Sequence, residues 1–295
     1  MNTKTTIQNI LIISTLLFII FPLRAQYLFP KESKMELLGK SDNMKQSNLF
    51  GNDLCNVFLF TEKNVICSVG GELDSLPFVT RVNEAGECKT AFLAGEKLIA
   101  QRKNEIVSLS QDMNSISQSV QEVKLLKYGK RDIRAFCSNN EGFFIVEYKS
   151  DKKTRKTVSV LSYFHLSTQQ QTSILEAEGK INCVSGDTAV MCFGLDSNLI
   201  VIANRQPAVL AIEKENITAV APSVAGIFYG TPSAVNFLTA KGQKITIVGQ
   251  GARQLIDNCN TLYMILEDGS LLRLLNTMAF IKFNTITEEK PHGNK

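Results

Sequence analysis

Short strand-like runs recur along the chain in groups of four, and this repeat limits the fold more than any other feature. The groups begin near residues 48, 88, 133, 181, 217 and 253. One unit therefore spans about 35 to 48 residues, which is typical of a four-stranded blade that stacks on its neighbours around an axis. We predict an all-β fold, with a single β-propeller of about six four-stranded blades over residues 46–284.

The clearest unit is the stretch 262–275, where two apolar runs flank Glu267, Asp268, Gly269 and Ser270. Asp-Gly supplies the positive φ angles that a tight hairpin turn needs. The run 278–283 is the predicted final strand, and we expect it to close the ring by sharing a sheet with the apolar patch 35–38, because propellers pair their exposed edges. The run 116–126 is a predicted strand with a short helix as the alternative.

The stretch 262–275 resembles the core of a repeat of the regulator of chromosome condensation family, in which a strand, Asp-Gly and a second strand recur. Stretches 234–249 and 188–202 are similar in outline, so the resemblance covers about a third of the chain. The usual Trp-Gly of that family is missing because the chain has no Trp. The resemblance implies a propeller, and it does not carry over nucleotide exchange or chromatin binding.

The N-terminal segment has the pattern of a secretory signal peptide over residues 1–25. Lys4 precedes an apolar run over 10–23, and Ala25 precedes Gln26 at the predicted cleavage site. The run is shorter than the roughly 20 residues that span a membrane, and an uncleaved N-terminal anchor is the alternative. We expect an exported protein in the periplasm, at the cell surface or secreted, with an irregular segment over 26–45 and a polar tail over 285–295.

The net charge limits the class of partner, and the positions of the Cys residues limit the number of disulfides. The formal net charge of +4 is too small to recruit nucleic acid. Most of the seven Cys lie within apolar runs, so we expect buried small hydrophobes, with at least four Cys outside any disulfide. One or two disulfides remain as an alternative, for example Cys55 with Cys67 across a hairpin.

Residues suited to catalysis are scarce. The only two His are His165 and His292, and the sequence has no Cys-x-x-Cys pair and no Gly-x-Ser-x-Gly motif. It therefore predicts no metal site, no nucleophile and no cofactor. Carboxylates that recur near blade starts could meet at the propeller axis, or could bind turn backbone instead. These are Asp53, Asp132, Asp187 and Asp257.

The local charge excess is a basic run in the longest unit, which predicts either a solvated loop or a docking patch for an acidic partner. Its members are Lys149, Lys152, Lys153, Arg155 and Lys156. The leading hypothesis is an exported, non-enzymatic propeller that acts as a protein-interaction or scaffold module in the cell envelope. It binds a protein partner and no nucleic acid, and meets a membrane only if the N-terminal segment is uncleaved. The alternative is a carbohydrate-active enzyme or sugar-binding protein that uses the axial carboxylates.

Overall fold

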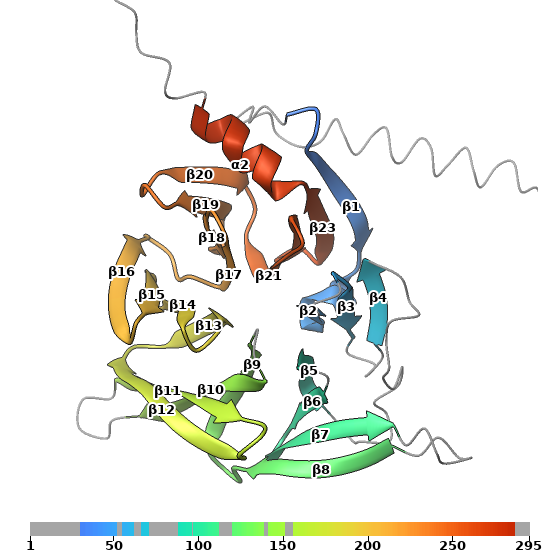
Figure 1. Ribbon diagram of the computed structural model, residues 1–295, viewed down its shortest axis with the longest axis vertical. Coiled ribbons are helices and arrows are strands. Elements are labelled where there is room, and N and C mark those ends of the chain that lie inside the picture. The colour runs from blue at the N-terminus through green and yellow to red at the C-terminus, as the bar shows by residue number, and fades with distance from the viewer. Residues whose placement is uncertain are drawn as a thin grey trace, which may run out of the picture.

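The computed structural model describes residues 30–51, 55–61, 66–70, 88–95, 97–111, 120–138, 141–150 and 156–286. Six antiparallel sheets form a ring around a central axis (Figure 1). Five sheets have four strands, and the remaining sheet has three strands within the described residues. The predicted all-β propeller of six blades is confirmed.

We number the blades in chain order. Blade 1 comprises β2 (Asn48–Gly51), β3 (Val57–Phe60) and β4 (Ile66–Gly70). Blade 2 comprises β5 (Cys88–Ala94), β6 (Lys97–Arg102), β7 (Glu105–Gln111) and β8 (Val120–Lys127). Blade 3 comprises β9 (Asp132–Cys137), β10 (Gly142–Ser150), β11 (Thr157–His165) and β12 (Gln170–Glu178). Blade 4 comprises β13 (Ile181–Gly186), β14 (Val190–Leu195), β15 (Asn198–Ala203) and β16 (Gln206–Ile212).

Blade 5 comprises β17 (Ala219–Ser223), β18 (Gly226–Gly230), β19 (Val235–Thr239) and β20 (Lys244–Val248). Blade 6 comprises β21 (Ala252–Asn258), β22 (Thr261–Leu266) and β23 (Ser270–Leu275), and its fourth strand is β1 (Lys34–Lys40) from the N-terminal side. A 3-10 helix, η1 (Asp42–Gln46), links β1 to blade 1, and α2 (Thr277–Ile286) follows β23.

The first strand of each blade lies innermost. Strands β2, β5, β9, β13, β17 and β21 surround the centre in Figure 1, and each contacts the next around the full ring. Every blade repeats the same antiparallel order, so these inner strands all run in one direction along the axis. Their first residues therefore gather at one mouth of the channel.

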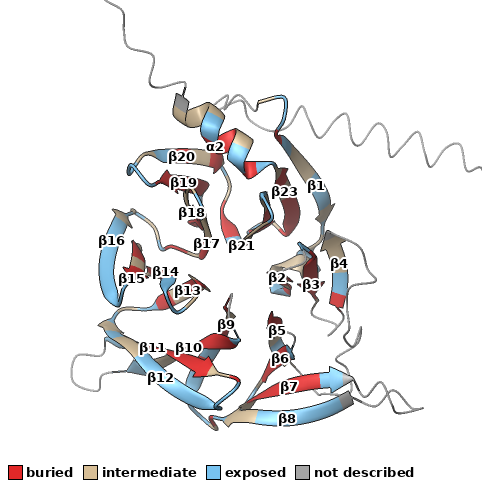
Figure 2. Cartoon of the chain, in the orientation of Figure 1, coloured by how far each residue is buried: buried red, intermediate tan, exposed pale blue. Residues whose placement is uncertain are grey.

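The core lies between blades. Apolar clusters fill the interfaces between neighbouring blades, and buried residues concentrate on the inner and middle strands, whereas β8, β12 and β16 are largely exposed (Figure 2). At the junction of blades 2 and 3, the ring of Phe143 stacks on Phe164 at 5.0 Å and meets the edge of Phe92 at 5.9 Å. This burial explains why strands with apolar residues on both faces recur in the sequence.

Strand β1 closes the ring by pairing antiparallel with β23, with Met35 opposite Leu274 and Leu37 opposite Leu272. The patch 35–38 therefore closes the last blade as expected, and the irregular segment predicted over 26–45 is wrong for residues 34–40. The predicted strand 278–283 is also wrong, because these residues lie in α2. Asn276 has a φ of 55° and its side chain accepts the N–H of Ala279, which ends β23 and starts the helix.

Two more assignments differ from the sequence analysis. Residues 120–127 form β8, so the helix alternative for 116–126 is wrong over that range. Strand β12 was not predicted, because this outer strand is mostly exposed and has no apolar alternation. The signal peptide with Ala25 and Gln26, and residues 287–295 of the polar tail, lie outside the described residues.

One disulfide joins Cys55 to Cys259, with the Cα atoms 5.5 Å apart, and so links blade 1 to blade 6. The suggested pairing of Cys55 with Cys67 is wrong, because Cys67 lies opposite Leu59 within the sheet, whereas Cys55 lies before the start of β3 and bonds to Cys259. The prediction that at least four Cys stay outside disulfides is confirmed. Five do so: Cys67, Cys88, Cys137, Cys183 and Cys192.

Candidate functional site

The inner strands enclose a cavity of about 440 Å³ along the propeller axis, lined by residues from all six blades. Side chains tie its wall together. Gln254 of blade 6 exchanges two hydrogen bonds with the backbone of Leu49 in blade 1, at 2.7 and 2.6 Å. The buried Gln101 of blade 2 likewise bridges to the backbone of Ile133 and Ala135 in blade 3, at 2.7 and 2.9 Å. Side-chain hydrogen bonds therefore link the inner strands of blades 6 and 1 and of blades 2 and 3 directly.

Positive charge dominates this cavity. Four basic side chains line it, each exposed, and none forms an ion pair with a described residue. Asp132 is the one carboxylate among the described lining residues. Like charges held together repel one another, so an anion in the channel would be stabilised. The four cations are Lys89, Arg134, Lys180 and Arg253.

These four residues come from different blades, and the repeat alone brings them together. Each lies within one residue of a predicted blade start, at 88, 133, 181 and 253. The carboxylates near blade starts were predicted as candidate site residues, whereas the cations there were not. Their position next to a predicted blade start is the feature that would have identified these cations from the sequence.

The channel wall between blades 3 and 4 holds two of the cations in place. Arg134 Nη1 donates to the carbonyl oxygen of Asn182 at 3.2 Å, and its guanidinium lies 5.0 Å from the ring centroid of Phe136. Lys180 Nζ lies 5.9 Å from the ring centroid of Tyr148. The Tyr148 hydroxyl donates to the carbonyl of Ile181 at 2.6 Å, and burial raises its pKa to about 12, so it remains a protonated donor at neutral pH.

The candidate axial carboxylates do not gather in the channel. Asp132 lines it, whereas Asp187 lies in the turn before β14, where its Oδ1 accepts the N–H groups of Ala189 and Val190 at 2.7 and 2.8 Å. Asp257 is absent from the channel lining, and Asp53 lies outside the described residues. Hydrolysis by paired carboxylates needs two of them about 5 to 10 Å apart. Among the described residues, a single carboxylate, that of Asp132, lines the channel.

Asp257 instead lies where β21 meets the start of α2. Its Oδ1 is buried without a hydrogen-bond partner among the described residues. Burial raises the pKa of its carboxyl to about 6, against a hydrogen bond from Thr277 that lowers it. The charged form is thus poorly solvated in the folded protein.

We expect Asp257→Asn to raise the free energy of unfolding at pH 7.5 by about 2 kcal/mol. The folded pKa exceeds the unfolded value near 4, so the folded state binds more protons between about pH 4 and pH 6 and loses stability as pH rises through that window. Urea unfolding at several pH values should show the gain shrinking towards about pH 4. The control, Asp132→Asn, alters an exposed carboxylate and should change stability little. An equal gain at both ends of the pH range would contradict this account.

The two described members of the basic run, Lys149 and Lys156, do not line the channel. Lys149 is exposed at the end of β10, and Lys156 forms an ion pair with Glu178. Lys152, Lys153 and Arg155 lie outside the described residues, so the docking role of this loop stays a prediction. His165 packs edge-to-face on Tyr163, with centroids 4.7 Å apart.

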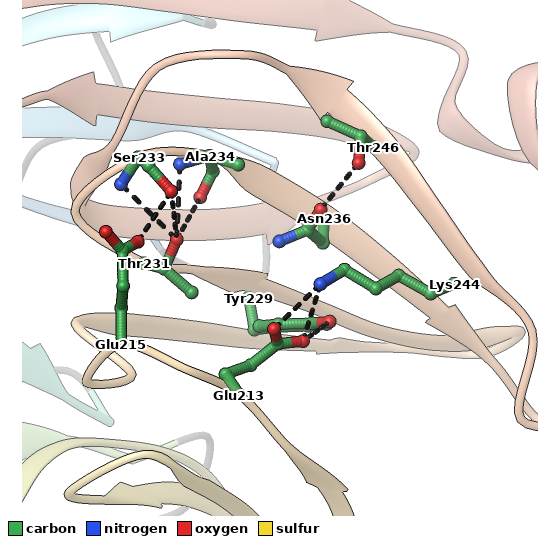
Figure 3. Close-up of polar contacts among 9 residues, drawn as sticks. All are labelled: Glu213, Glu215, Tyr229, Thr231, Ser233, Ala234, Asn236, Lys244 and Thr246. Atoms are coloured by element: carbon green, nitrogen blue, oxygen red, sulfur yellow. Dashed lines mark hydrogen bonds and ion pairs between the residues drawn. The ribbon is translucent and has the colours of Figure 1, made fainter.

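A second polar cluster lies in blade 5 (Figure 3). Glu213 accepts the hydroxyl of Tyr229 at 2.5 Å and the Nζ of Lys244 at 2.7 and 2.8 Å. Glu213 directly follows β16, so these contacts fasten the connection between blades 4 and 5 onto blade 5. Each of the three side chains already has a partner, which suits a structural role.

Within the described residues, no group of three or more His, Cys, Asp or Glu side chains is placed to hold a metal ion. Among the same residues, no helix is long and apolar enough to cross a bilayer.

No family model matches the chain, and no curated protein matches it. Solved structures do. The catalytically inactive virginiamycin B lyase from Staphylococcus aureus with quinupristin is 11% identical, with a TM-score of 0.53, over 83% of this chain and 99% of that one. The extracellular domain of the BT4673 hybrid two-component system from B. thetaiotaomicron is 9% identical, with a TM-score of 0.51, over 82% of this chain and 39% of that one.

At such low identity these similarities establish the fold alone. They do not confirm the resemblance to chromosome-condensation repeats. The chain is a six-bladed β-propeller with a cationic central channel.

Proposed function

We propose that this protein is an exported, non-enzymatic propeller that binds a partner protein in the cell envelope. The partner inserts an acidic segment into the mouth of the central channel. The observation that carries the proposal is the set of four channel cations, none of which forms an ion pair with a described residue.

Several properties of the channel support binding of a peptide segment. A cavity of about 440 Å³ is within the size range of ligand sites, and its wall is fixed by side chains that bridge neighbouring blades. A preformed site loses little conformational entropy when it binds. The signal-peptide pattern supports export, and the cell envelope is where such a partner would be met.

The carbohydrate alternative has less support. It requires a pair of channel carboxylates, and the described residues supply Asp132 only. The chain also has no Trp, the best aromatic platform for cations and flat ligand faces. A single carboxylate among cations suits anion binding better than acid–base hydrolysis.

We expect a fluorescein-labelled hexaglutamate peptide to bind the mature protein, and Lys89→Glu with Arg253→Glu to weaken binding by about tenfold or more. Fluorescence anisotropy measures the affinity, which should also fall as salt rises from about 50 to about 500 mM because screening weakens charge pairing. The matched control, Lys97→Glu with Lys127→Glu, makes the same charge change on blade 2 outside the channel lining. Absence of binding, or equal losses in both variants, would refute the proposal.

A further inference from the structure

We infer that the channel wall between blades 3 and 4 is a built carboxylate site, formed by Arg134, Lys180 and the side-chain amide of Asn182. The inference rests on the proposed function and adds where the acidic segment binds. A carboxylate side chain of that segment would lie between the two cations, with Asn182 as a third donor.

Arg134 is oriented for this task by contacts that leave its charge uncompensated. One N–H is taken by the carbonyl of Asn182, and the guanidinium plane packs near Phe136. No described carboxylate forms an ion pair with it. A guanidinium has five N–H donors in a planar fork, and such a fork binds a carboxylate through two parallel hydrogen bonds.

Tyr148 connects the two cations. Its ring lies under Lys180, and its hydroxyl contacts both Arg134 and the backbone of Ile181. Because Tyr148 belongs to β10 and Lys180 immediately precedes β13, this ring holds the wall of blade 3 against blade 4. The two cations are therefore presented to the same part of the channel.

Asn182 supplies an independent sign of a ligand site. Its Nδ2 is buried and has no hydrogen-bond partner among the described residues, and Asn182 is one of the residues that line the cavity. A buried donor without a partner is costly, and native proteins rarely keep one without a reason. Rotation about the Cβ–Cγ bond would turn the amide towards a bound carboxylate.

The surroundings favour a singly charged protein carboxylate. Asp132 lies two residues from Arg134 on the same face of β9, so a doubly charged phosphate would be repelled more strongly than a carboxylate. Acidic sugars would need a free aromatic face for their rings. One face of Phe136 is already covered by Arg134, and one face of Tyr148 by Lys180.

The test uses the full mature chain and three probes: labelled hexaglutamate, oligogalacturonate and inorganic phosphate. We expect Arg134→Gln with Lys180→Gln to weaken hexaglutamate binding by about twentyfold, because two positive charges are removed. Asn182→Asp should weaken it by about tenfold, because a donor amide is replaced by a negatively charged carboxylate. The control, Lys97→Gln with Lys127→Gln, should change the affinity by less than about twofold. Thermal melts check that each variant is folded.

A second readout reports on the amide itself. In ¹⁵N-labelled wild-type protein, the side-chain resonance of Asn182 should move as hexaglutamate is added and stay still with hexaglutamine. An unmoved resonance during saturating binding overturns the site, even if a variant fails to fold.

The remaining outcomes separate this inference from the proposed function. If Arg134→Gln with Lys180→Gln binds hexaglutamate as wild type does while Lys89→Glu with Arg253→Glu does not, the channel function stands and this site is wrong. If hexaglutamate does not bind at all, both fail. Tighter binding of oligogalacturonate or phosphate than of hexaglutamate overturns the choice of a protein carboxylate.

Discussion

Replacing Cys259 by Ser should lower the free energy of unfolding by about 3 to 5 kcal/mol. The disulfide joins residues 204 positions apart. In the unfolded chain it would close a very long loop, and the entropy lost in that state grows with loop length. In the folded protein it fastens blade 1 to blade 6, where the ring closes.

Guanidinium unfolding of the oxidised wild type and of Cys259→Ser measures the loss. Cys55→Ser and the double variant should be destabilised to the same extent as the single variant, because all three lack the same crosslink. Cys67→Ser is the matched control, since Cys67 is exposed and forms no disulfide. Equal stability of wild type and Cys259→Ser under oxidising conditions would show that closure does not depend on the crosslink.

Apolar pattern alone predicted the blades well where strands are buried on both faces. The hairpin 262–275 is an example, because β22 and β23 pack in the core and Asp268 accepts the N–H of Ser270 in the turn. Strand β12 was missed for the opposite reason. It lies on the outside of blade 3, pairs on one side only and carries mostly polar residues.

Residues 278–283 show a different limit. A short run of apolar residues does not distinguish strand from helix, since either can bury it. The deciding feature is Asn276, whose left-handed backbone and side-chain cap start α2. Neither the backbone conformation nor the cap of Asn276 follows from the four-strand repeat of the sequence.

The channel illustrates why a site in a repeat fold is hard to see from local clusters. The basic run that begins at Lys149 is visible in the sequence, but Lys149 does not line the channel. The channel cations stand 45 or more positions apart in the chain, for example Lys89 and Arg134. They line one cavity because each lies near the start of the inner strand of its blade, so the site is predictable from the repeat register and not from spacing along the chain.

The second large effect concerns α2, which lies across blades 5 and 6 near β20 and β23 (Figure 1). Phe280 is fully buried and Ile281 is nearly so, and both belong to the apolar cluster that contains Ile245, Ile247 and Leu272. The helix therefore covers apolar surface that the two blades would otherwise expose.

A chain that ends at Thr277 should lose about 4 kcal/mol or more of unfolding free energy and aggregate more readily, because removing a buried Phe alone typically costs about 3 to 5 kcal/mol. Phe280→Ala should reproduce most of this loss in an otherwise intact chain, whereas Met278→Ala alters a residue that is 38% exposed and should cost little. Ending the chain at Ile286 is the matched truncation and should be nearly neutral. Melting temperature and light scattering distinguish these cases.

Since β1 already completes blade 6, the loss would come from the uncovered apolar surface and not from an open strand edge. If truncation at Thr277 and Phe280→Ala both melt at the wild-type temperature, α2 does not contribute to the core of blades 5 and 6.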